Sequence, residues 1–184
     1  MRIAYVLYDD ITLLDFVGFY DPVSRLRSLG YLPQLSWDLC ARGPQVTDNH
    51  GTVINIGRVL PDLSGYELVY VPGGFGTRSL LADREFLDWL GSAAGVPHLV
   101  SVCTGSLLLG AAGLLAGRRA TTHFNEYDRL APYVGEVVRE ELVHDGPVVT
   151  GGAVAAALHL GLYVAELLAG KKAAMAIRRS MNYR

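Results

Sequence analysis

The sequence has few cysteines and no long apolar run, and both shortages exclude classes of protein. Its two cysteines, Cys40 and Cys103, are too few for a disulfide framework. No apolar run approaches the roughly 18 residues of a membrane span, and the opening "MRIAYVLYDD" lacks the apolar region and cleavage site of a signal peptide. We therefore expect no membrane partner and a cytoplasmic location, where both cysteines stay reduced.

An excess of charge of one sign is also lacking. Lys and Arg number 16 against 18 Asp and Glu, which gives a formal net charge of −2 spread along the chain. This balance leaves no electrostatic footprint for nucleic acid, so we expect no nucleic-acid partner. The one basic stretch, "KKAAMAIRRSMNYR", is typical of a solvated helix face with cations near a helix C-terminus.

Metal-binding patterns are missing too. None of the five histidines has metal-ligand spacing, and together with Cys103 they form no zinc pattern, so we expect no metal. The apolar content of 51% and the charged content of 18% are those of a globular protein. The length of 184 residues, without repeats or low-complexity linkers, predicts one domain spanning residues 1–184.

Short apolar runs alternate with helical patterns along the chain. Continuous apolar runs, typical of strands buried on both faces, cover residues 2–8, 68–74 and 98–103, with a further strand candidate at 34–42 and a hairpin at 46–56. Helical patterns cover residues 21–30, 84–95, 105–117, 125–133 and 153–170. This alternation predicts an α/β fold, a mostly parallel sheet with helices on both faces.

In such sheets, ligands bind beyond the carboxyl ends of the strands. Three loops follow strand ends in this way and are expected to meet in one crevice. They are "YDDITLLD" (8–15), "PGGFGTR" (72–78) and "CTGS" (103–106).

Cys103 is the residue in these loops that best fits a nucleophile. It ends a predicted strand, and a helix begins within two residues, as in the elbow that exposes a nucleophilic side chain above a sheet. The first N–H groups of a helix favour an anion, which lowers a thiol pKa and predicts a thiolate at neutral pH. A buried, inert cysteine is the alternative. Cys40 lies inside a strand and is expected to have no chemical role.

Residues from the other loops are candidates to assist Cys103. Gly73 and Gly74 lack the Gly-Lys-Ser/Thr ending of a phosphate loop, and suit either a plain turn or a backbone N–H that stabilises developing negative charge. Asp15 stands between apolar residues, where burial would raise its pKa and let it hold a proton. His123 is the histidine best placed to reach the same end of the sheet.

Four segments of the chain carry a family resemblance. They are "LLDFVGFYDPVSRL", "VYVPGGFGT", "SVCTGSLLLGAAGLLAGRRATTHF" and "VVTGGAVAAALHLGLYVAELL". Together they resemble the DJ-1/PfpI (ThiJ) superfamily, and within it the isonitrile hydratases. The resemblance covers nearly the whole chain, and it implies a flavodoxin-like three-layer α/β/α sandwich and a homodimer.

The resemblance also implies roles for individual residues. Cys103 resembles the elbow cysteine of the family, and Asp15 resembles the acidic residue that hydrogen-bonds this cysteine in the hydratases. The other matches are Thr104 to the threonine after the nucleophile, Gly73 or Gly74 to the backbone donor, and His123 to a histidine that several members have near the cysteine. The Cys-His pair of the protease-type members is missing, because Thr104 follows Cys103.

The implied reaction is hydration of a small-molecule isonitrile, R–N≡C, to an N-substituted formamide, without a cofactor. Cys103 would attack the terminal carbon and Asp15 would supply the proton. Two alternatives stay open: a glyoxalase-type enzyme acting on α-oxoaldehydes, and a non-enzymatic redox sensor or small-molecule binding module in which Cys103 is oxidised. The transcription regulators of the superfamily add a helix-turn-helix module, for which the sequence up to Arg184 is expected to leave no room.

Overall fold

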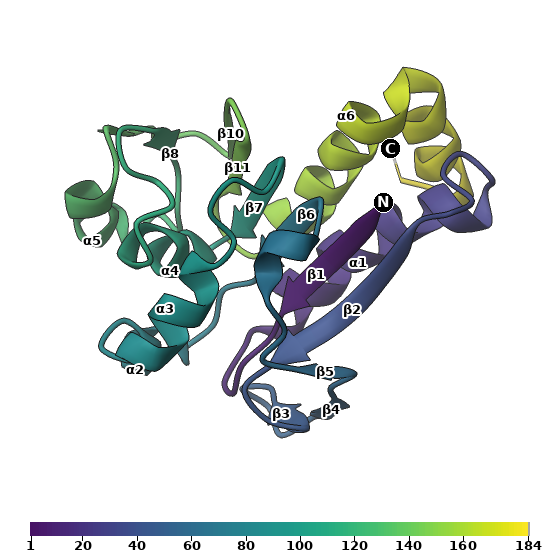
Figure 1. Ribbon diagram of the computed structural model, residues 1–184. Helices are drawn as coiled ribbons and strands as arrows, with labels where there is room; N and C mark the ends of the chain where they lie inside the picture. The colour runs from purple at the N-terminus through teal and green to yellow at the C-terminus, as the bar shows by residue number, and fades with distance from the viewer. Residues whose placement is uncertain (184) are drawn as a thin grey trace.

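The computed structural model describes residues 1–183, and a central seven-stranded sheet organises them (Figure 1). Its strands are β1 (Arg2–Val6), β2 (Ser36–Ala41), β5 (Arg58–Val59), β6 (Leu68–Val71), β7 (His98–Val102), β10 (Leu142–Asp145) and β11 (Val148–Gly151). They lie in the order β10-β11-β7-β6-β1-β2-β5, and all neighbours are parallel except β10 and β11. Two small ladders pair β3 (Gln45–Thr47) with β4 (Val53–Asn55) and β8 (Arg119–Ala120) with β9 (Glu136–Val137).

Helices cover both faces of the sheet. On one face lie α1 (Leu13–Ser28) and α6 (Ala156–Ser180), and on the other lie α2 (Thr77–Leu80), α3 (Arg84–Gly91), α4 (Gly105–Ala111) and α5 (Tyr127–Leu130) (Figure 1). Single 3₁₀ turns occupy Leu63–Gly65 and Ala131–Tyr133. The expected flavodoxin-like α/β/α sandwich with a mostly parallel sheet is therefore confirmed.

The middle strands lie in the core, as their continuous apolar sequences predict. Every residue of β6 is buried, as are the last four residues of β1 and of β7. Strands buried on both faces need helices on both sides, because each face would otherwise expose apolar area to water. On the α1 side, Phe19 stacks on Tyr70 with ring centroids 3.9 Å apart. This packing fixes α1 against the face of the sheet, close to the carboxyl end of β6.

The prediction that the first helix begins at residue 21 is wrong. It begins at Leu13, eight residues earlier, and Pro22 lies in its interior. Proline is common at the first position of a helix, where its missing N–H group would have no partner in any case. In the structure, Pro22 packs instead against α6, where a side chain at Gly161 would collide with its ring. Asp15 consequently lies in the first turn of α1 and not in a loop.

Other helix ends also differ from the predicted ones. The helix expected over 105–117 stops at Ala111, and glycines with positive φ at 113 and 117 turn the following chain. The one expected over 125–133 reduces to α5 and a 3₁₀ turn. The helix expected over 153–170 starts at Ala156 and breaks at Gly170 (φ 82°), after which a second helical part runs to Ser180. The hairpin expected over 46–56 is present as β3 and β4.

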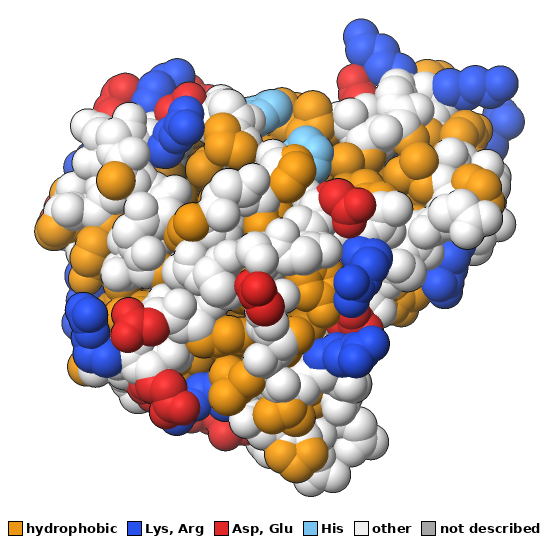
Figure 2. Space-filling model, in the orientation of Figure 1, with side chains coloured by type: hydrophobic (Ala, Val, Ile, Leu, Met, Phe, Trp, Pro, Cys, Tyr) orange, Lys and Arg blue, Asp and Glu red, His pale blue; other side chains and the backbone are white. Residues whose placement is uncertain are grey.

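The surface mixes charges of both signs. On the face seen in Figure 2, acidic and basic side chains alternate, and several basic ones lie over the part of the molecule occupied by α6. Of the helices in residues 1–183, none combines the length and apolar character that crossing a membrane requires.

Candidate active site

The three loops after β1, β6 and β7 meet at the carboxyl edge of the sheet. Thr12 N–H donates to the Gly73 carbonyl oxygen at 3.0 Å, which joins the first loop to the second. Gly74 N–H donates to Thr104 Oγ1 at 3.0 Å, which joins the second loop to the third. The crevice expected from the sequence is therefore formed by direct hydrogen bonds between its walls.

Cys103 lies on a strained turn between β7 and α4. Its φ is +54°, a left-handed conformation that costs a non-glycine residue about 1–2 kcal/mol. The backbone around it is held on both sides: Cys103 N–H donates to the Gly152 carbonyl oxygen at 2.7 Å, and its own carbonyl oxygen accepts from Thr122 Oγ1 at 3.0 Å and Ser106 Oγ at 3.2 Å. These bonds keep the elbow that the sequence predicts.

Two glycines let the loops approach one another this closely. A Cβ at Gly73 would lie 2.7 Å from both Asp15 Oδ2 and Cys103 Cβ. A Cβ at Gly105 would overlap the carbonyl oxygens of Val71 and Pro72. Both contacts are shorter than side-chain carbons tolerate, so the site is assembled from backbone that only glycine can supply.

Asp15 is a fully buried carboxyl group beneath this elbow, with 0% of its surface exposed. Its Oδ2 accepts a hydrogen bond from Gly73 N–H at 3.0 Å. Its Oδ1 accepts no hydrogen bond of good geometry from residues 1–183, and the side chain beside the carboxyl group is the Cys103 thiol. The structure thus brings together Asp15 and Cys103, which are 88 positions apart in the sequence.

Cys103 is expected from the sequence to be a thiolate at neutral pH, but the surroundings of the pair favour the protonated thiol. Burial raises the pKa of the Cys103 thiol to about 12, the negative charge of Asp15 adds to this shift, and the Thr104 N–H opposes it. Burial also raises the pKa of Asp15 to about 6, while the Gly73 N–H and the neighbouring Cys103 thiol lower it. At neutral pH the pair therefore holds one proton, on sulfur, next to a carboxylate that can accept it.

The raised pKa of Asp15 predicts how stability changes with pH. Its folded value of about 6 lies above the unfolded value of about 3.9, so the folded state binds more protons between these values, and the free energy of unfolding falls as pH rises through this window. We expect a loss of about 2–3 kcal/mol attributable to Asp15 between pH 4 and pH 7. Urea unfolding of the wild type and of Asp15→Asn across this range measures it: the wild type should gain this stability relative to the variant as pH falls, and a constant difference would contradict the shift.

The backbone donors expected at Gly73 and Gly74 are already engaged. Gly73 N–H is bound to Asp15, and Gly74 N–H to Thr104 Oγ1, which donates in turn to the Gly74 carbonyl oxygen at 3.2 Å. The two glycines therefore hold Asp15 and Thr104 in place. The N–H that interacts with the Cys103 sulfur is that of Thr104.

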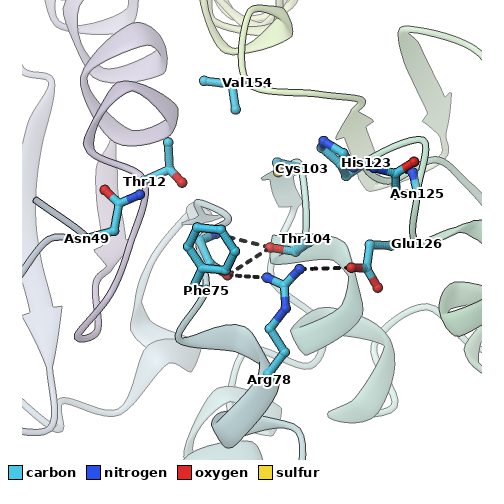
Figure 3. A pocket seen from close by; sticks show the side chains of 11 residues that line it. Thr12, Asn49, Phe75, Arg78, Cys103, Thr104, His123, Asn125, Glu126 and Val154 are labelled. Carbon is cyan, nitrogen blue, oxygen red and sulfur yellow. Dashed lines mark hydrogen bonds and ion pairs between the residues drawn. The ribbon is translucent and has the colours of Figure 1, made fainter.

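A cavity of about 390 Å³ opens above Cys103 (Figure 3). It is lined by Thr12, Asn49, Gly74, Phe75, Arg78, Cys103, Thr104, His123, Asn125, Glu126 and Val154. The cavity volume lies in the range of small-molecule sites. His123 is half-buried in its wall, stacked on Phe124 with ring centroids 4.2 Å apart. Cys103, Thr104, Gly74 and His123 thus share one cavity, whereas Asp15 and Gly73 lie directly beneath it.

Sequence reasoning missed the charged part of this cavity. Arg78 Nη2 forms an ion pair with Glu126 Oε1 at 2.8 Å, across 48 positions of sequence. Arg78 is the last residue of the "PGGFGTR" loop, which the sequence predicts to lie at the site, so its position in that loop could have indicated a role in the cavity. Nothing in the sequence around Glu126 indicates that it reaches the same cavity.

Neither a metal cluster nor a second reactive thiol was found among the described residues. Within residues 1–183, no three His, Cys, Asp or Glu side chains lie close enough together to hold a metal ion. Cys40 is buried in β2, where its sulfur lies 3.7 Å from Tyr66 Oη, and burial raises the pKa of its thiol to about 11.

The fold and the site together define an α/β protein with a strand-to-helix elbow, in which a buried carboxyl group lies beneath a cysteine. The chain belongs to the DJ-1/PfpI family, whose sequence profile matches residues 1–167.

Individual relatives agree with this assignment. The chain is 36% identical to an isonitrile hydratase of Pseudomonas putida, over all of this chain and 78% of that protein. It is 30% identical to the HTH-type transcriptional regulator CdhR of Pseudomonas aeruginosa, over 86% of this chain and 48% of the regulator. The crystal structure of a ThiJ/PfpI family protein from Pseudomonas syringae superposes with a TM-score of 0.90 at 30% identity, covering 99% of this chain and 74% of that one.

Proposed function

We propose that the protein hydrates a small-molecule isonitrile to an N-substituted formamide, as an enzyme of the lyase class. The observation that carries this proposal is the pair of Cys103 and the fully buried Asp15, which lie side by side at the floor of a cavity. Similarity to the Pseudomonas putida isonitrile hydratase along the whole chain supports it.

The first step forms a covalent thioimidate. Cys103 Sγ attacks the terminal isonitrile carbon, and a C–S bond forms. The thiol proton passes to the Asp15 carboxylate and from there to the same carbon, which gives R–N=CH–S–Cys103. The pair supplies both the nucleophile and the proton, so no other acid is needed.

The second step releases the formamide. Asp15, again a carboxylate, accepts a proton from water as the water oxygen attacks the thioimidate carbon, and that proton goes to the nitrogen. The resulting R–NH–CH(OH)–S–Cys103 collapses, the C–S bond breaks, and the hydroxyl proton returns to sulfur through Asp15. One isonitrile and one water give one R–NH–CHO, and the enzyme is restored.

Residues around the pair would orient the intermediate. Thr104, tied to Gly74 by two hydrogen bonds, holds the β6 and β7 loops at a fixed spacing. Gly73 holds Asp15 in register with the thiol. His123 lines the cavity and is proposed to donate a hydrogen bond to substrate.

Turnover of cyclohexyl isocyanide, followed as formation of N-cyclohexylformamide, tests the proposal. We expect the wild-type protein, with Cys103 shown to be reduced, to form the formamide catalytically. A protein that is inert under these conditions would overturn the proposal. Lactate formation from methylglyoxal would then indicate the glyoxalase alternative, and a sulfinate at Cys103 under mild peroxide, without turnover of either compound, the redox sensor.

We also propose that the chain acts as a homodimer in the cytoplasm, where its two free cysteines would stay reduced. Leu14 and Val17, three residues apart on α1, support a contact between copies because they are 55% and 38% exposed. Leu14 directly precedes Asp15 and Val17 follows it by two residues, so the contact would involve the same end of α1 as Asp15.

We expect Leu14→Asp to shift the protein from dimer to monomer, because it places a charge in the apolar contact. Sedimentation velocity at micromolar concentration measures the change. Leu29→Asp, at the end of α1 and 42% exposed, is the matched control and should leave the dimer intact. A wild-type protein that sediments as a monomer would contradict the proposed assembly.

A further inference from the structure

The cavity above Cys103 has one wall rich in hydrogen-bond donors, and Arg78 is its centre (Figure 3). Arg78 Nη1 donates to the Gly74 carbonyl oxygen at 3.1 Å, and Nη2 donates to Glu126 Oε1 at 2.8 Å. A guanidinium group carries five N–H donors, so three stay available for a ligand. The side chain is 39% exposed, and its accessible part faces the cavity.

The charges around Glu126 leave this wall positive. Glu126 is nearly buried, and its second oxygen, Oε2, lies 3.4 Å from Arg129 Nη1. One carboxylate is thus shared by two arginines, and the group of three carries one excess positive charge. Such an excess attracts an anionic group that enters the cavity.

His123 and Asn125 extend the donor wall. His123 Nδ1 accepts a hydrogen bond from Asn125 N–H at 3.2 Å. In the neutral imidazole the proton then lies on Nε2, which is a second donor in the lining of the cavity. The Glu126 carboxylate in this wall is held by its two arginines.

Apolar side chains also line the cavity, at two separate places (Figure 3). Phe75 lies beside Arg78, with its ring centre 5.0 Å from the guanidinium group, and is 66% exposed at the rim of the cavity. Val154 lines the cavity at a distance from Phe75. A ligand that complements the donors and these apolar side chains has an apolar body and one anionic group.

We propose that Arg78 is a specificity-determining residue that binds an anionic group of the substrate, and that the substrates are isonitriles bearing a carboxylate. This inference rests on the proposed isonitrile chemistry. The spacing suits a short molecule: Thr104, adjacent to Cys103, donates to the Gly74 carbonyl oxygen, and the same oxygen accepts from Arg78. A substrate carbon at Cys103 and a carboxylate at Arg78 can therefore belong to one small compound.

Alkylation of Cys103 tests the anion site without any catalysis. Iodoacetate and iodoacetamide have nearly the same shape and differ in charge. The rate of Cys103 alkylation by iodoacetate divided by the rate with iodoacetamide, read by peptide mass spectrometry, therefore reports how strongly the cavity attracts an anion. We expect Arg78→Met to lower this ratio about tenfold, as for loss of a charge-assisted hydrogen bond. If Arg78→Met loosens the Gly74 loop and makes Cys103 generally less reactive, both rates fall by the same factor and the ratio does not change.

Two further variants sharpen the experiment. Glu126→Gln removes the carboxylate that competes for Arg78, so the ratio should rise about threefold. Arg84→Met makes the same change of net charge on an exposed side chain of α3 and should leave the ratio within twofold of wild type. A ratio unchanged by both Arg78→Met and Glu126→Gln would overturn the assignment of Arg78.

Hydration of isocyanoacetate and of isocyanoacetamide separates the substrate class from the chemistry. We expect wild type to favour isocyanoacetate in kcat/KM about tenfold, and Arg78→Met to lose this preference. If alkylation behaves as expected but neither isonitrile is hydrated, the anion site stands and the proposed reaction fails. If both are hydrated with the same preference in wild type and Arg78→Met, the reaction stands and the role of Arg78 is wrong.

Discussion

Replacing Cys103 by alanine is expected to lower kcat/KM for isonitrile hydration by on the order of 10⁴-fold, because the covalent thioimidate can no longer form. The Cys103 side chain is small and 5% exposed, and the hydrogen bonds that hold this turn are made by the backbone N–H and carbonyl groups of Cys103. The fold should therefore survive the loss of the sulfur. Initial rates of formamide formation over a range of substrate concentrations measure kcat/KM, and circular dichroism of the variant measures whether the fold survives.

Cys40→Ala is the matched control, since it removes the other thiol of the chain from inside β2. Its activity should stay within about twofold of wild type, apart from a small loss of stability from the missing sulfur. Trapping supplies a second readout: acid quenching during turnover should leave the thioimidate mass on the peptide containing Cys103. Substantial turnover by Cys103→Ala would show that water reacts with the isonitrile directly.

Replacing Asp15 by asparagine is expected to lower kcat/KM by about 10²–10⁴-fold, the range for loss of a general acid–base group. Asparagine has nearly the same shape, and its amide oxygen can still accept from Gly73 N–H. It cannot take the thiol proton, so the attack on the isonitrile and the later activation of water both slow.

The pH profile distinguishes this role from a structural one. In wild type, kcat/KM should rise as pH increases through about 6, since ionised Asp15 is the form that accepts the thiol proton. Asp15→Asn should lose this limb. Asp9→Asn is the control: Asp9 follows the same strand, but its carboxylate accepts from Thr47 N–H at 2.8 Å, away from Cys103. A wild-type profile that is flat between pH 5 and pH 7 would contradict a proton-accepting Asp15.

The sheet and the elbow could be predicted from the sequence because both depend on local patterns. Continuous apolar runs are buried strands, and a cysteine at the end of one, followed by Thr104 and Gly105, marks a strand-to-helix turn. The rule that ligands bind at the carboxyl edge then predicts which loops meet. That convergence is confirmed by the bonds between Gly74 and Thr104.

The rest depends on contacts between residues that are distant in the sequence. The start of α1 was misplaced because Pro22 packs against Gly161, and no local pattern announces a proline that is accommodated by a glycine of another helix. The sequence predicts a thiolate at Cys103 from the helix that follows it, but burial and the Asp15 carboxylate, which no local pattern shows, raise the pKa of the thiol. The ion pair of Arg78 and Glu126 also joins residues that are far apart in the sequence, so no local pattern predicts it.

The close backbone approach at Gly73 and Gly105 has a consequence for how this site can evolve. Side chains at these positions would collide with the backbone, Asp15 or Cys103, so the part of the site that holds the thiol and the carboxyl group tolerates little sequence change. Phe75 and Arg78 line the cavity from the 72–78 segment, and Val154 lines it from the segment before α6. Substitutions there can alter which molecules enter while the reacting pair stays as it is. A selection for new substrates should therefore accumulate changes at the cavity wall and leave its glycine floor untouched.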